Sequence, residues 1–100
     1  GTLLTEAVVR RVESFCMQCA AFLRAGDFEA AQKESKILKK TLAHFAGAVG
    51  TVEDKERLQL IALRTRKQLR QHEREKVLTL FHDAPESVRT AAAIALGLRE

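Results

Sequence analysis

The sequence contains neither tryptophan nor tyrosine, and its 100 residues include only one proline, two cysteines and five glycines. An all-β domain needs many turns and many β-forming side chains, so this scarcity argues against one. Two cysteines are too few for the disulfide framework of a small secreted domain. No stretch approaches the roughly 18–20 consecutive apolar residues of a membrane-spanning helix, and the N-terminus has no signal-peptide pattern. We therefore expect an intracellular protein, cytoplasmic or nuclear, that has no membrane partner.

Apolar spacing predicts that residues 1–46 form an antiparallel pair of helices. Hydrophobic residues are 46% of the chain and charged residues 30%, as in a globular domain. Within residues 2–25 and again within 28–46, apolar residues recur every three or four positions, which is typical of one helix face. Gly26 permits the left-handed backbone that ends a helix, and Asp27 can cap the next one. So short a connection favours an antiparallel hairpin.

The spacing of apolar residues predicts a long third helix over residues 51–82, with few apolar residues in its middle. Its apolar stripe is broadened by Leu60 and Leu63, but between positions 64 and 76 only one residue is strongly apolar. We interpret the stretch as one continuous helix whose middle is solvated or lies on something acidic. The alternative is a break in the middle, with residues 77–100 docking separately.

The fourth segment, residues 84–99, is apolar on almost every side of a helix. Such a helix needs burial on more than one side, which suggests a neighbour beyond residue 100 or a partner chain. Together the four segments predict an all-α, four-helix, bundle-like single domain over residues 1–100. One candidate contact with a partner is the apolar surface of this last helix, formed by Val88, Ala92, Ile94 and Ala95.

Three segments follow one another at the end of the chain. They are an apolar stretch that ends at Asp83, the pair Val88-Arg89, and an alanine-rich stretch that ends at Leu96-Gly97. In order and spacing, this last quarter of the chain resembles a HEAT repeat, the helical hairpin unit of α-solenoids. The resemblance implies scaffolding and protein recognition, without chemistry, and a place in an α-solenoid. The Val-Arg-Ala pattern has no second copy in residues 1–76, which argues against a regular solenoid here.

A turn of small residues, followed by an aromatic residue and alanines, lies within the stretch Cys19–Ala31. This turn is similar to those of TPR and MIT helical hairpins, and the likeness extends over residues 12–76. MIT domains are three-helix bundles that bind short peptides, so the resemblance implies peptide binding. Neither resemblance brings catalytic residues with it.

Cys16 and Cys19 form a Cys-x-x-Cys pattern, which occurs in zinc sites and in redox enzymes. A zinc site needs two more ligands at close spacing, and the redox motif follows a strand. The chain has no other cysteine, its histidines at 44, 72 and 82 are scattered, and the pattern lies within a predicted helix. We therefore interpret the cysteines as core residues and the histidines, His44, His72 and His82, as surface or packing residues. We expect no catalytic site, no metal and no cofactor, and the protein is predicted not to be an enzyme.

A run of basic residues is the strongest local feature of the sequence. Its six positive side chains, set against Glu73 and Glu75, give a charge of +4, which equals the net charge of the chain. On a continuous helix, every fourth residue of the run falls on one ridge. The ridge is interpreted as a solvated face, as a contact for an acidic protein, or as a phosphate-binding surface. The six residues are Arg64, Arg66, Lys67, Arg70, Arg74 and Lys76, and the ridge consists of Arg66, Arg70 and Arg74.

Taken together, these patterns predict a non-catalytic protein–protein interaction or scaffold module. We expect it to be excised from a larger protein or to be one subunit of an assembly. Its expected partner is another protein with an acidic or helical surface, and self-association is a further candidate. The alternative function is a helical domain that binds nucleic acid through the basic ridge.

Overall fold

The computed structural model describes residues 5–46 and 52–99, and this part of the chain is all-helical, as predicted. No strand occurs among the described residues. None of the described helices is both long and apolar enough to cross a membrane. The helices are α1 (Glu6–Arg24), α2 (Phe28–Ala46), α3 (Val52–Gln68), α4 (Gln71–Thr79) and α5 (Glu86–Ala95).

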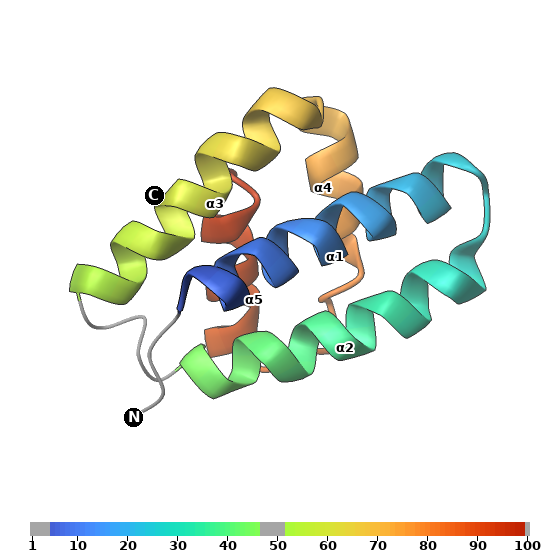
Figure 1. Cartoon of the computed structure of the whole chain (residues 1–100). Coiled ribbons are helices and arrows are strands. Elements are labelled where there is room, and N and C mark those ends of the chain that lie inside the picture. The colour runs from blue at the N-terminus through green and yellow to red at the C-terminus, as the bar shows by residue number, and fades with distance from the viewer. Residues whose placement is uncertain (1–4, 47–51, 100) are drawn as a thin grey trace.

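The helices α1 and α2 form the predicted antiparallel hairpin and run side by side (Figure 1). Gly26 has a positive φ of 77°, the left-handed conformation that glycine adopts without steric cost. The N–H of Asp27 then donates to the carbonyl of Phe22 at 2.9 Å. The Oδ1 of Asp27 accepts the N–H of Ala30 at 3.1 Å and so caps α2. The local signals in the sequence were therefore sufficient to place this turn, whereas residues 1–4 lie outside the described residues.

The continuous helix predicted for residues 51–82 is wrong. The alternative of a break is confirmed, but residues 77–100 do not dock as a separate unit, because α4 spans position 77 and the core is shared. The helix α3 ends at Gln68, and Arg70 has extended backbone angles before α4 begins. On an unbroken helix, Val77 and Phe81 would point roughly 130° and 170° away from the core-facing stripe of α3. Both side chains are buried in the core, and the break allows this. The predicted start of this helix, at residue 51, lies outside the described residues.

The helix α5 lies behind α1 in the view of Figure 1 and runs at a steep angle to α1 and α2. It packs mainly against α2 and α3 and much less against α4. Its four predicted contact residues are at most 3% exposed, so the prediction that they form a surface for a partner is wrong. Their apolar character is explained by burial within this chain. These residues are Val88, Ala92, Ile94 and Ala95.

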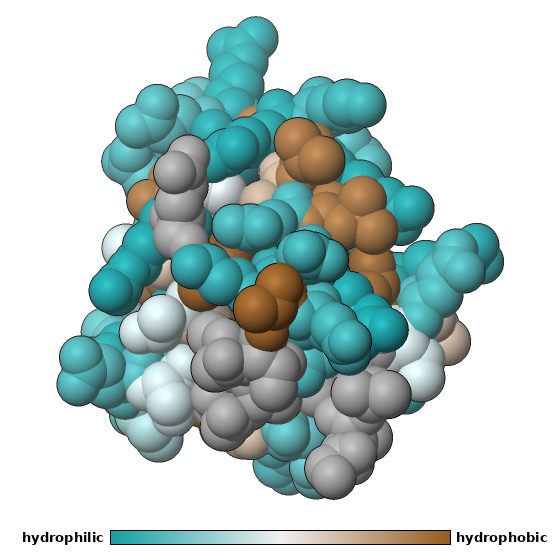
Figure 2. All heavy atoms as spheres, turned by 90° about the vertical axis from the view of Figure 1, so that its left-hand side faces the viewer, coloured by the Kyte–Doolittle hydropathy of each residue, from teal (hydrophilic) through white to brown (hydrophobic). Residues whose placement is uncertain are grey.

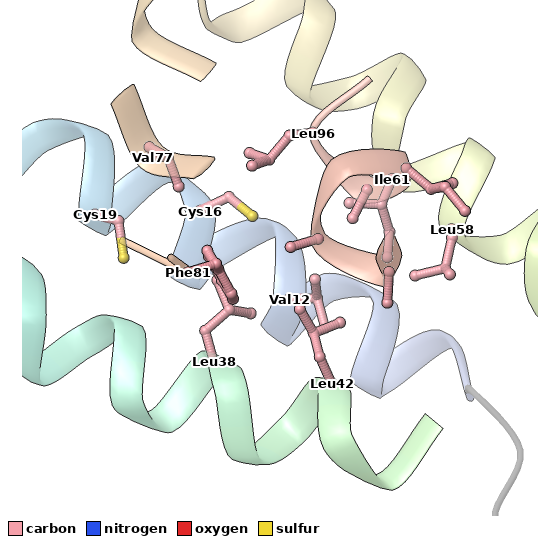
Figure 3. Close-up of a cluster of buried hydrophobic side chains, with 14 of the residues drawn as sticks. Val12, Cys16, Cys19, Leu38, Leu42, Leu58, Ile61, Val77, Phe81 and Leu96 are labelled. Atoms are coloured by element: carbon pink, nitrogen blue, oxygen red, sulfur yellow. The ribbon is translucent and has the colours of Figure 1, made fainter. Parts of the chain in front are cut away.

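Side chains from all five helices, and from the segments that follow α3, α4 and α5, meet in one hydrophobic core (Figure 3). Phe81 is its largest fully buried side chain. One buried polar group joins two helices, because the Oγ1 of Thr65 in α3 donates to the carbonyl of Ala95 in α5 at 3.1 Å. The core thus holds α5 between the α1–α2 hairpin and α3.

Candidate functional site

The predicted ridge of Arg66, Arg70 and Arg74 does not form, because the chain breaks between α3 and α4. Three of the six basic residues of the run are bonded inside this chain. Arg64 forms an ion pair with Glu13 of α1, with an Nη1–Oε2 distance of 3.1 Å. Arg66 and Arg74 turn toward the end of α5 instead of lying along one helix face.

Two guanidinium groups converge on the carbonyl oxygens that follow α5. The Nε and Nη2 of Arg66 donate to the carbonyl of Gly97 at 3.2 and 2.9 Å. The Nη1 of Arg74 donates to the carbonyls of Leu96 and Gly97 at 3.0 and 3.2 Å. Cations at a helix C-terminus are favourable because the unpaired carbonyls there carry partial negative charge. We call this arrangement the arginine clamp, and it links α3, α4 and the end of α5.

Gly97 is matched to the clamp in two ways. It has a positive φ of 69°, and a Cβ atom at this position would lie 2.6 Å from the Nε of Arg66. A glycine therefore allows both the turn after α5 and the close approach of the arginine. The clamp accounts for Arg66 and Arg74 as structural residues.

The three remaining basic residues, Lys67, Arg70 and Lys76, are exposed. Two of them, Arg70 and Lys76, line a hollow of about 380 Å³ between the end of α1 and the start of α4. We call it the α1–α4 hollow. It is lined by Ala20, Leu23, Arg24, Arg70, His72, Glu73 and Lys76.

The α1–α4 hollow has an apolar base and a mainly positive rim. Glu73 is the one carboxylate among its lining residues, and its Oε2 accepts a hydrogen bond from the Nε of Arg24 at 3.0 Å. Its Oε1 accepts the backbone N–H of Arg70 at 3.1 Å. The bond from Arg24, followed by that from Arg70, holds the pKa of Glu73 below its ordinary range. The carboxylate is therefore charged at neutral pH and already has partners, whereas the side chains of Arg70 and Lys76 form no ion pair among the described residues.

A second surface feature lies on α3, where sequence reasoning assigned Leu60 and Leu63 to the core stripe. Both are exposed, at 44% and 55%. Figure 2 shows apolar atoms at a mainly polar surface on the side of the molecule where α3 begins. The two leucines border a groove of about 410 Å³ that reaches Ala62 and Ile94. The sequence contained one sign of this exposure: with Leu60 and Leu63, the apolar stripe of residues 51–82 is too wide for one packed neighbour to cover.

Cys16 and Cys19 are free thiols buried in the core, which confirms their interpretation as packing residues (Figure 3). Burial raises the pKa of both thiols, that of Cys19 to about 12. The Sγ of Cys19 donates to the carbonyl of Ala31 at 3.9 Å. A buried, protonated thiol is a poor nucleophile and a poor metal ligand.

His44, His72 and His82 are exposed, as the surface interpretation predicts, and they belong to different helices or turns. No cluster of histidine, cysteine or acidic residues suited to a metal ion occurs among the residues that the structure describes.

No family model, curated protein or solved structure matches this chain. The resemblances to HEAT, TPR and MIT hairpins consequently stay predictions.

Proposed function

We propose that the chain is a non-catalytic protein-interaction module that binds an acidic, partly apolar segment of another protein in the α1–α4 hollow. One observation carries the proposal. The residues that line the hollow combine apolar side chains with three cations, Arg24, Arg70 and Lys76, and only one carboxylate. That carboxylate, Glu73, is bonded to Arg24, which leaves Arg70 and Lys76 to receive an acidic group. Peptide-binding sites of this kind recognise a charged residue placed next to an apolar one.

Magnitudes indicate that both halves of the hollow must contribute. An exposed ion pair contributes only about 0.2–1 kcal/mol, so two pairs with Arg70 and Lys76 give weak attraction. Burying the apolar surface that half-buried Leu23 still exposes adds about 25 cal/mol per Å². We therefore expect the partner segment to need both an acidic and an apolar side chain, and binding to weaken moderately as salt rises.

The alternative function, nucleic-acid binding, has less support. Phosphate recognition needs several cations that follow the spacing of the backbone. Arg64, Arg66 and Arg74 are bonded within the chain, so half of the basic run is engaged elsewhere.

Titration of labelled probes tests the proposal. The probes are a peptide of alternating glutamate and leucine, the same peptide with lysine in place of each glutamate, and a short DNA duplex. We expect binding of the acidic peptide and amide chemical-shift changes centred on the hollow. The double change Arg70→Glu and Lys76→Glu should weaken this binding by about tenfold or more, because attraction is replaced by repulsion.

A matched control reverses the same amount of charge outside the hollow. Lys36 and Lys40 are exposed on α2, and the double change Lys36→Glu and Lys40→Glu should alter the affinity by less than about twofold. Equal losses in both double variants would mean that only net charge matters. Binding of the duplex in place of the acidic peptide would overturn the proposal in favour of the alternative function.

A further inference from the structure

One face of α3 carries five exposed side chains that lie away from the core. They follow one another at intervals of three and four residues, so they fall within roughly 80° of one another around the helix. The core-facing residues Leu58 and Ile61 lie on the opposite side. We call this face the α3 stripe, and it consists of Glu53, Glu56, Leu60, Leu63 and Lys67.

The order of chemistry along the α3 stripe is acidic, acidic, apolar, apolar, basic. When two copies of the stripe run in opposite directions, the acidic end of one lies beside the basic end of the other and the apolar residues meet in the middle. If a second α3 runs antiparallel about a two-fold axis between Leu60 and Leu63, Leu60 of one copy faces Leu63 of the other. Glu56 then faces Lys67 of the second copy at both ends of the apolar pair. A parallel arrangement would instead place Glu56 against Glu56 and Lys67 against Lys67.

We propose that the α3 stripe is a dimerisation surface on which a second copy of this chain packs antiparallel. A two-fold interface uses the same patch on both subunits, so the patch must complement itself, and the α3 stripe meets this condition in both charge and apolar character. The leucines are the exposed apolar residues at its centre, at 44% and 55%. The groove beside them is also lined by Glu56, Gln59, Arg66 and Arg99, so polar groups lie next to the two leucines.

The intrachain contacts leave these side chains available. Lys67, Glu53 and Glu56 form no ion pair among the residues that the structure describes. Glu56 and Lys67 are eleven positions apart, about 16 Å along α3, so they cannot pair within one chain. An attraction between these two residues can therefore arise only between copies.

The expected dimer is weak. One helix stripe buries less surface than the roughly 1,200–2,000 Å² of a stable interface, so we expect dissociation constants in the micromolar range or above. Sedimentation equilibrium over protein concentrations from about 10 µM to about 1 mM covers this range. The wild-type chain should change from monomer to dimer within it.

Charge reversal with rescue tests the antiparallel pairing. Glu56→Lys alone and Lys67→Glu alone should each weaken dimerisation by about tenfold or more, because both ends then carry like charges. The double variant Glu56→Lys with Lys67→Glu should restore wild-type dimerisation. A merely structural effect of either change would not be rescued in this way, and circular dichroism checks that every variant remains helical.

Two further variants complete the design. Leu60→Gln with Leu63→Gln should abolish the dimer and leave the fold intact, because both side chains are exposed. Lys76→Glu, which changes the α1–α4 hollow and lies outside the α3 stripe, should dimerise as the wild type does, so failure of the hollow is distinguishable from failure of the stripe. A chain that stays monomeric at about 1 mM overturns the proposal, and so does a dimer that the single reversals leave unchanged.

Discussion

The arginine clamp and the α1–α4 hollow take their cations from the same basic run but use them differently. In the clamp, Arg66 and Arg74 donate to backbone carbonyls after α5, so both guanidinium groups already have partners within the chain. In the hollow, Arg70 and Lys76 point to a surface with an apolar base and no acidic group left for them. The difference comes from the break between α3 and α4, which sends neighbouring residues of the sequence in different directions. A basic run therefore predicts a binding surface only after the helix that carries it is known.

The largest expected effect comes from removing the side chain that anchors the break. Leu69 lies between α3 and α4 and is only 4% exposed. Leu69→Ala should lower the free energy of unfolding by about 3 kcal/mol, through lost burial and the cavity left behind. Urea denaturation followed by circular dichroism measures this loss.

Leu63→Ala is the matched control, because it removes the same atoms from an exposed leucine of the preceding helix. It should change the free energy of unfolding by less than about 0.5 kcal/mol. Similar losses in the two variants would mean that Leu69 does not anchor the break.

The second prediction compares the clamp with the hollow directly. Arg74→Met retains most of the aliphatic side chain but removes the donor to Leu96 and Gly97, and should cost about 2 kcal/mol of unfolding free energy. Arg70→Met removes an exposed charge and should cost less than about 0.5 kcal/mol, while weakening the acidic peptide. Thermal or urea unfolding and peptide titration on the same two proteins give both readouts. The reverse pattern, with Arg70 more important for stability, would show that the two cations had been assigned the wrong roles.

Local features of the fold could be predicted from the sequence, and long-range ones could not. The α1–α2 hairpin followed from apolar spacing and from Gly26-Asp27, because the forces that shape it act within a few residues. The break after Gln68 carries no proline or glycine. Only the helical phase of Val77 and Phe81, which is incompatible with a straight helix, signals it. Such a phase change becomes decisive once those side chains are known to be buried.

The candidate site was predictable only in part. The basic run includes Arg70 and Lys76, and these two residues line the hollow. The engagement of Arg66 and Arg74 depends on the carbonyl of Gly97, which lies 31 and 23 positions away in the sequence. The exposure of Leu60 and Leu63 depends on which helices cover α3. Both facts are properties of the tertiary arrangement, which residue spacing does not contain.

The smallest expected effect concerns the carboxylate of the hollow. Arg24 and the N–H of Arg70 hold the pKa of Glu73 below its ordinary value, so the unfolded chain binds a proton more readily than the folded one. The stability that Glu73 contributes is present above about pH 4.3, its ordinary pKa, and is lost as the pH falls through the lower pKa of the folded state. Glu73→Gln should therefore lose less stability on acidification than the wild type in urea unfolding at a series of pH values. Asp83→Asn should act in the same direction, because the pKa of Asp83 is lowered by its bond with Lys39.

The two carboxylates differ in what else depends on them, and this difference distinguishes the hollow from an ordinary ion pair. Glu73→Gln leaves Arg24 without a charged partner, so the hollow gains one positive charge beside Arg70 and Lys76. At neutral pH this variant should bind the acidic peptide about two- to fivefold more tightly than the wild type. Asp83→Asn makes the same change in net charge outside the lining of the hollow and should leave the affinity within about twofold. If the two variants bind the peptide with equal affinity, the Arg24–Glu73 ion pair has no effect on binding and contributes only to the stability of the fold.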